Sequence, residues 1–206
     1  MIAILIAACN ENSNYNTVNS NEAQKHDSVT ASVSISNSDT IPRHIEGIKK
    51  AYEMTLAQLK NGVLDSTSFK YSCNNERNGT VSYFLDKGAL RMIVHRYNEY
   101  SHHSAEDYYF VKDSILFFTY FERVSWSFDG PEGSTKDNVT EQRVYLIDQK
   151  PIRCLEKKFV VRSNEASNPS SETVANKEVS CASLESVINP FSVLLKHREN
   201  PTSTCL

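Results

Sequence analysis

Histidine and carboxylate side chains are concentrated in one short segment. This segment is the part of the sequence that most resembles a catalytic or metal-binding site in its residue types. These residues are His95, Glu99, His102, His103, Glu106 and Asp107. Imidazole and carboxylate groups on a loop can bind a transition metal or transfer a proton. Neighbouring residues of an extended chain point to opposite sides, so only one of His102 and His103 can readily join a given site. The sequence favours the alternative, a polar loop exposed to water.

Other patterns of a catalytic centre are missing from the sequence. It lacks the nucleophile, zinc, phosphate-binding and dinucleotide-binding motifs that residue spacing reveals. Carboxylates such as Glu122 and Glu141 have no spacing that marks them as an acid and base pair. Its cysteines are too far apart in sequence for a zinc site. We therefore predict no catalytic residue, no metal site and no cofactor.

Four cysteines remain after the N-terminal region, and they are Cys73, Cys154, Cys181 and Cys205. An even number of cysteines favours disulfides if the protein reaches an oxidising compartment. A helix after Cys181 would run about 24 Å. The tail that follows it can extend back over a similar length at ~3.3 Å per residue. We therefore predict a disulfide between Cys181 and Cys205. Cys73 and Cys154 are expected to be buried thiols, with a bond between them as the alternative.

Aromatic residues are concentrated in the middle of the chain. Fifteen of the 20 lie between Phe69 and Phe128. Consecutive residues of a strand face opposite sides, so rings should populate both faces of one sheet. A face left uncovered would form an exposed aromatic platform, and such patches tend to be binding sites. The candidates for this ligand surface are Tyr108, Phe117, Tyr120 and Trp126. The alternative is that the rings fill a thin core.

Three segments of similar pattern predict the strands that hold these residues. They begin at Tyr83, Tyr109 and Tyr145, and each has an apolar run, a short polar turn and a second apolar run. This pattern is typical of β-hairpins, and three in succession predict an antiparallel meander. Two longer loops are expected between the hairpins, at 98–105 and 125–140.

Helical spacing marks both ends of this β region. Apolar residues from Ile45 to Leu59 recur on one helical face, in a predicted helix that starts near Pro42 and ends at Asn61-Gly62. Leu184 to Leu195 predict a second helix, which Pro190 should kink or split. The predicted fold class is α+β: an antiparallel β-meander of about three hairpins flanked by an N-terminal and a C-terminal helix. It forms a single domain at residues 42–206.

The N-terminal residues differ from this domain. Residues 1–9, MIAILIAAC, are an apolar run of the length found in signal peptides, far below the ~20 residues that span a bilayer. The positive segment that usually precedes such a run is missing, which leaves open a start upstream of Met1. Asn, Ser and Thr then occupy 17 of the 31 positions 10–40. Such a segment buries too little apolar surface to fold, so we predict a flexible tether.

The residues Ile6-Ala7-Ala8-Cys9 resemble the lipobox of bacterial lipoproteins. The resemblance implies a signal peptide at residues 1–8 that is cut before Cys9. Cys9 would then be acylated on its sulfur and its new amino group, and residues 9–41 would form the lipidated, disordered tether. Two or more acyl chains anchor a protein stably without a transmembrane helix. The hairpin pattern is also similar to that of envelope lipoproteins with a β-meander. A plain secretory signal, with Cys9 incidental, is the alternative.

Charge and composition restrict the functions that remain. A formal charge of -3 without clustered Lys and Arg argues against a nucleic-acid surface. We expect a lipid-anchored protein on the periplasmic or cell-surface side of a membrane, acting as a non-enzymatic binding or accessory module. Its partner besides the membrane would be a protein or a glycan. The alternatives are an envelope hydrolase that uses the histidines near His102, and a structural spacer without a ligand.

Overall fold

A computed structural model describes residues 40–74, 76–201 and 205–206, and residues 41–206 form one compact unit. The elements in chain order are α1 (Ile45–Lys60), β1 (Asp65–Cys73), β2 (Arg77–Asp86), β3 (Ala89–Glu99), β4 (His103–Lys112), β5 (Ile115–Phe128), β6 (Thr135–Ile147), β7 (Lys150–Arg162), β8 (Lys177–Val179) and α2 (Leu184–Glu199). The predicted signal peptide and residues 9–39 of the predicted tether, Cys9 included, lie outside the described residues. Neither of these two helices has the length and apolar content to cross a membrane.

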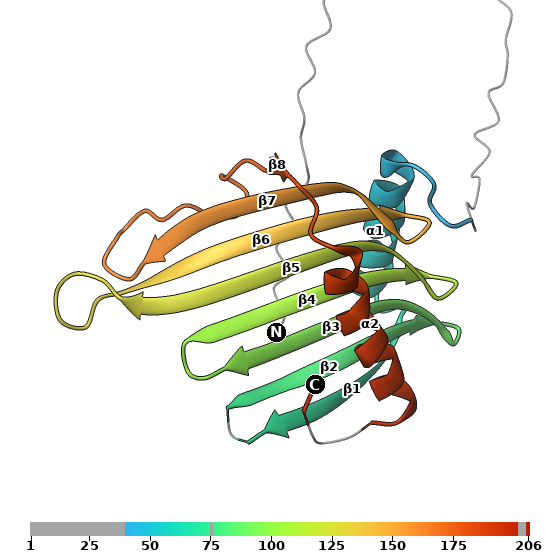
Figure 1. The fold of residues 1–206 in the computed structure, drawn as a ribbon, viewed down its shortest axis with the longest axis horizontal. Coiled ribbons are helices and arrows are strands. Elements are labelled where there is room, and N and C mark those ends of the chain that lie inside the picture. Colours follow the sequence, from blue (N-terminus) through green and yellow to red (C-terminus); the bar gives the residue numbers. More distant parts are fainter. Residues whose placement is uncertain (1–39, 75, 202–204) are drawn as a thin grey trace, which may run out of the picture. The chain divides into compact units, whose positions relative to one another are not determined.

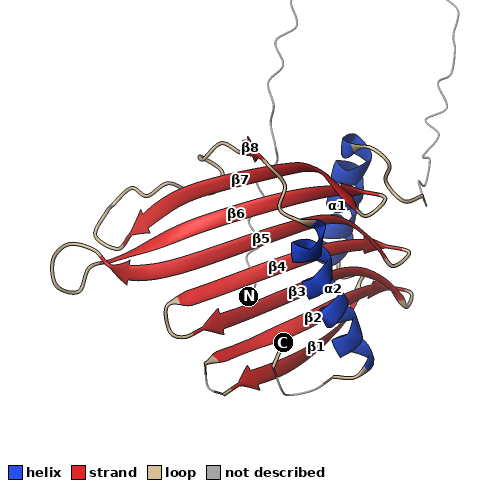
Figure 2. Ribbon diagram, in the orientation of Figure 1, coloured by secondary structure: helices blue, strands red, loops and turns tan. Residues whose placement is uncertain are grey.

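All eight strands belong to one antiparallel sheet, and their order in space is their order in the sequence (Figures 1 and 2). This confirms the α+β class and the β-meander. The sheet contains four hairpins, where the sequence predicts about three. The sequence pattern did not predict the strands at the two edges of the sheet. β1 is rich in polar residues and β8 has only three residues, so neither shows a clear apolar alternation.

The three similar segments form equivalent hairpins, β2–β3, β4–β5 and β6–β7. Each turns over two residues with positive φ, as a type I′ turn does: Lys87-Gly88, Asp113-Ser114 and Asp148-Gln149. Each also has a shift in the ladder at the same place before its turn, at Phe84/Leu85, Phe110/Val111 and Tyr145/Leu146. The three bulges therefore lie in neighbouring strands at one end of the sheet, where bulges increase strand twist.

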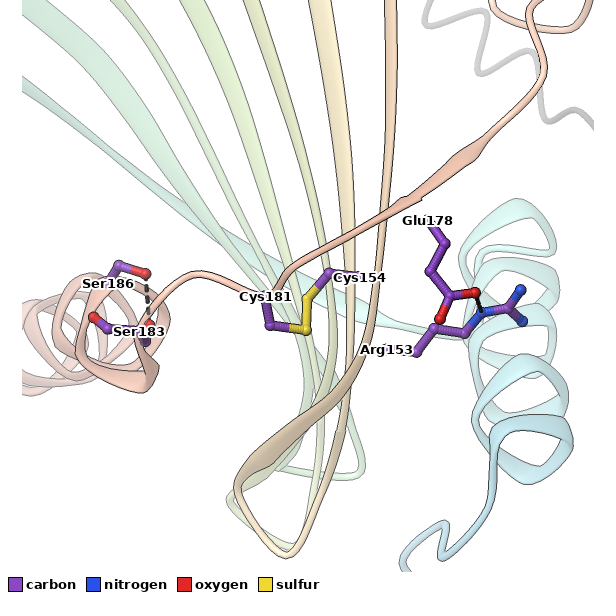
Figure 3. Close-up of a disulfide and its surroundings, with 6 residues drawn as sticks. All are labelled: Arg153, Cys154, Glu178, Cys181, Ser183 and Ser186. Carbon is purple, nitrogen blue, oxygen red and sulfur yellow. Dashed lines mark hydrogen bonds and ion pairs between the residues drawn. A yellow bond between two sulfur atoms is a disulfide. The ribbon is translucent and has the colours of Figure 1, made fainter.

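The two helices pack on opposite faces of the sheet, at the end that carries these three turns (Figure 1). Figure 3 looks along the sheet and shows the pale blue α1 on one side and the pale red α2 on the other. α1 buries Ile48 and Leu56 in a core with the rings of β4, β5 and β6. α2 buries Phe191 and Leu194 in a second core with Tyr83 and other residues of the opposite face.

The helix ends differ in detail from the prediction. α1 begins at Ile45, three residues after Pro42, because His44 is the N-cap and its Nδ1 accepts a hydrogen bond from Gly47 N at 3.0 Å. α2 continues through Pro190 as a single helix, so the split that was one of two expectations does not occur.

Two disulfides join the C-terminal segment to the sheet, and their pairing corrects the prediction. Cys73 is bonded to Cys205. Cys154 is bonded to Cys181, and Figure 3 shows this second bond. The predicted Cys181–Cys205 bond is wrong, and so is the expectation of two buried thiols. Cys73 and Cys154 both belong to the core on the α2 side. The chain is therefore tied to β7 before α2 and to β1 after it.

The predicted long loops are mostly strand. The β3–β4 connection has only residues 100–102, and the β5–β6 connection only residues 129–134. The polar residues at 98–99, 103–105, 125–128 and 135–140 belong to paired strands instead. The helices cover the opposite end of the sheet, so the strands extend beyond both of them (Figure 2). We call this uncovered part the open half, and we name the faces of the sheet the α1 face and the α2 face.

Candidate functional site

The residues of the predicted histidine cluster lie on different faces. His95 and Asp107 are paired across β3 and β4 and are buried on the α2 face, while Glu106 lies on the α1 face. His95 Nε2 is 2.8 Å from the hydroxyl of Tyr71. Asp107 forms an ion pair with Arg123. The described residues contain no group of three His, Cys, Asp or Glu side chains that could hold a metal ion. The cluster is therefore not one site.

The predicted aromatic platform is only partly at the surface. Tyr108 and Tyr120 are Cα partners and half-buried on the α1 face, and Trp126 follows on the same face of β5. Phe117 is 2% exposed and belongs to the core under α1 together with Phe118. The bulge in the β4–β5 hairpin interrupts the alternation of the strand, which explains why both rings are in one core. Phe117 is therefore excluded from the surface.

A row of charged residues crosses the open half on the α1 face, and sequence analysis did not find it. Successive strands place Arg96, Glu106, Glu122, Glu141 and Lys157 as direct Cα partners. Three carboxylates are thus neighbours across β4, β5 and β6. The residues are 10 to 19 positions apart in sequence, so only the strand register reveals that they are adjacent.

Each of the three carboxylates has a partner. Arg96 Nε lies 2.9 Å from Glu106 Oε2, and the Tyr108 hydroxyl also donates to Glu106. Tyr120 donates to Glu122 Oε2 at 3.0 Å. Glu141 is 1% exposed and pairs with Arg143 at 2.9 Å.

Burial and neighbouring carboxylates raise the pKa values of two groups in and beside this row, Glu122 and Tyr120. Burial raises the pKa of Glu122, and the carboxylates of Glu106 and Glu141 raise it further, against the hydrogen bond from Tyr120. Burial also raises the pKa of Tyr120, so its hydroxyl remains a proton donor at neutral pH. The two groups therefore present a mixture of donors and acceptors at the floor of the open half.

A hollow of about 480 Å³ lies over β1 to β5 in the open half. Its polar lining consists of Lys70, Asn78, Thr80, Arg96, Asn98, Ser104, Glu106 and Glu122. A smaller hollow of about 230 Å³ is lined in part by Tyr97, His103 and Arg123. The larger hollow ends toward β6 and β7, where residues 163–176 cross the α1 face: Lys157 donates to the Ser171 carbonyl, and Arg143 donates to Asn176 Oδ1 at 3.2 Å.

Several aromatic side chains lie together at the end of the open half that is farthest from the helices. Trp126 stacks on His102 with ring centroids 4.7 Å apart, and its Nε1 donates to the Ser101 carbonyl at 2.6 Å. Phe128 contacts Trp126 edge-on at 5.5 Å and is 75% exposed. Tyr100, in the β3–β4 connection, is 62% exposed. We call the three rings in contact, His102, Trp126 and Phe128, the aromatic tip.

The aromatic tip adjoins the polar hollow. Asn98 and Ser104, which line the hollow, are Cα partners at the ends of β3 and β4, next to the connection that holds Tyr100 and His102. Trp126 lies four residues beyond Glu122 in β5, on the same face. The tip and the hollow therefore form one continuous surface.

The chain matches no protein-family model, no curated protein and no solved structure. The candidate site is therefore described by its own geometry: a polar hollow with no net formal charge beside exposed rings, on the part of the α1 face that lies outside the core beneath α1.

Proposed function

We propose that this protein is a lipid-anchored binding module of the cell envelope, whose ligand docks on the α1 face of the open half. The observation that carries the proposal is the continuity of the polar hollow with the aromatic tip. The core beneath α1 lies at the other end of the sheet and contains none of the residues that line the hollow. Contiguous exposed apolar patches often mark binding sites.

Two further observations support an envelope location. The apolar run that ends at Cys9 is the feature that motivates lipid anchoring. Two disulfides are typical of proteins that fold in an oxidising compartment, such as the periplasm or the cell surface. The lipid would hold the domain at a membrane, and the tether would let the open half reach its ligand.

The other candidate functions have less support. A hydrolase built on the histidines near His102 would need them to face a common pocket. His102 instead stacks on Trp126, and His95 is buried on the other face. A spacer needs no open polar hollow. The binding module is therefore the function that fits the geometry best.

Site-directed photo-crosslinking tests this proposal in cells. A photo-reactive amino acid is placed at position 98, beside the hollow, in the full chain. The matched control carries it at position 193, where Val193 is 47% exposed on α2. We expect adducts at position 98 and none at position 193, since the ligand docks on the open half. Adducts at position 193 alone would place the binding surface on α2 and contradict the proposal.

A further inference from the structure

We infer that the ligand of the open half is a neutral oligosaccharide, whose hydroxyls bind in the polar hollow and whose ring face packs on the aromatic tip. This inference rests on the proposed function. The first observation is the charge of the hollow. Lys70 and Arg96 contribute two positive charges and Glu106 and Glu122 two negative ones, so its formal charge is zero. Arg96 and Glu106 already neutralise each other at 2.9 Å. A strongly charged ligand would therefore gain little electrostatic attraction.

The second observation is the supply of free hydrogen-bonding groups. Asn78, Thr80, Asn98 and Ser104 line the hollow with amides and hydroxyls. In the part of the chain that the structure describes, none of these four side chains has a hydrogen-bond partner. Amides and hydroxyls donate and accept at close range, as sugar hydroxyls do. A ligand with many hydroxyls can satisfy all four.

The third observation is the aromatic tip on the same face. Ring faces present a flat apolar surface, and the carbon–hydrogen face of a sugar ring is its apolar complement. Phe128 is 75% exposed, and Trp126 is held in place by its hydrogen bond to Ser101. The four residues from Glu122 to Trp126 span about 13 Å at ~3.3 Å per residue. That distance exceeds one sugar ring, so we infer an oligosaccharide.

The position of the surface argues against an extended peptide. Peptides that bind to sheets do so mostly at an open edge, where unpaired backbone groups accept an added strand. The hollow lies on the face of strands that are paired on both sides, apart from the edge strand β1. A peptide would therefore obtain no backbone ladder there, and only side-chain contacts would remain.

The experiment uses Trp126 as its own reporter, because it is the only tryptophan of the full chain. The full chain is titrated with neutral oligosaccharides of hexose and N-acetylhexosamine, and tryptophan emission is recorded. We expect a saturable change in emission. Asn98→Ala keeps the reporter and should weaken binding about tenfold, the effect of one lost hydrogen bond of ordinary strength. Asn189→Ala, in an exposed position on α2, is the matched control and should bind as the parent does.

The outcomes separate this inference from the proposed function. One outcome is that neutral sugars leave the emission unchanged, while acidic oligosaccharides or peptides bind the parent and fail to bind Asn98→Ala. This result would contradict a neutral glycan as the ligand and would still support the docking surface. No response to any neutral oligosaccharide, with adducts still formed at position 98, would have the same meaning. Neutral sugar binding that Asn98→Ala and Asn189→Ala weaken equally would contradict the hollow as the sugar site.

Discussion

At the scale of single residues, His95 is the clearest case in which the surroundings determine the chemistry. It is 5% exposed, and burial lowers its pKa to about 3, with the positive charges of Arg77 and Arg123 contributing less. The ring is therefore neutral at physiological pH and is held by the Tyr71 hydroxyl at 2.8 Å. This role is structural, and it differs from the metal or acid–base role that the histidine cluster suggested.

Acid should destabilise the fold through His95. The unfolded chain binds a proton as the pH falls through the usual value of 6.5, whereas the folded chain does so only near pH 3. The unfolded state therefore binds more protons between these two pH values. As the pH falls from 7 to 5, the free energy of unfolding should decrease by roughly 2 kcal/mol because of His95. The measurement is urea unfolding at both pH values, compared with His95→Gln.

The comparison with the variant isolates this histidine. Asp107 and Glu122 have raised pKa values, so their contributions change in the opposite direction on acidification, and they remain in both proteins. His103→Gln, at an exposed position, should keep the pH dependence of the parent. An equally steep loss of stability in His95→Gln would refute the assignment.

Gly79 permits a close packing that any larger residue would block. A Cβ added there would lie 2.6 Å from the Arg96 carbonyl oxygen and 2.7 Å from the Tyr71 ring. Gly79→Ala should lower the free energy of unfolding by about 3 kcal/mol, since a backbone atom cannot move aside cheaply. The Cβ of Gly133→Ala would have no atom within 4 Å, so the positive φ is the source of strain there. This variant should lower the free energy of unfolding by about 1 kcal/mol. Equal losses in thermal or urea unfolding would contradict the steric explanation.

At the scale of elements, the three equivalent hairpins differ in how well their turn residues suit the conformation. Gly88 has φ +83 at the second turn position of β2–β3, while Gln149 has φ +59 at that position of β6–β7. Gln149→Gly should therefore raise the free energy of unfolding by about 0.5 to 1 kcal/mol. The reciprocal Gly88→Ala should lower it by a similar amount, because no atom lies within 4 Å of the added Cβ. A less stable Gln149→Gly would show that its side chain outweighs the turn geometry.

The two disulfides should contribute unequally to stability. Cys73–Cys205 closes 132 residues of sequence and Cys154–Cys181 closes 27. Loop-closure entropy gives about 5 kcal/mol for the first and about 3.5 for the second. Unfolding of the two double Cys→Ser variants measures this difference. A non-reduced peptide map of the parent protein should contain these two linked pairs, and a peptide that joins Cys181 to Cys205 would contradict them.

Local patterns explain how much of the fold the sequence predicts. Turn residues and apolar alternation identified the hairpins that start at Tyr83, Tyr109 and Tyr145, and helical spacing identified both helices. Contacts between residues that are far apart in the sequence could not be predicted from these local patterns. Glu106, Glu122 and Glu141 become neighbours only through strand register, and the bulge beside Val111 accounts for the burial of Phe117. Polar strand ends looked like loops because neither helix covers them.

At the scale of the whole molecule, the proposed envelope function depends on the proposed membrane anchor. The described residues form the domain that carries the proposed binding surface, and residues 1–39, which carry the proposed anchor, precede it. A neutral glycan receptor is useful at a membrane only if export and acylation occur. We therefore expect Cys9→Ala to move the protein from the membrane fraction to the soluble fraction, which fractionation followed by immunoblotting would measure.

The most direct measurement is the mass of the N-terminal peptide of the full protein extracted from membranes. Lipid anchoring predicts that this peptide begins at Cys9 and carries the added mass of acyl chains on its sulfur and amino group. A protein recovered from the cytosol with residues 1–8 intact and no acyl mass would contradict the anchor and, with it, the envelope function.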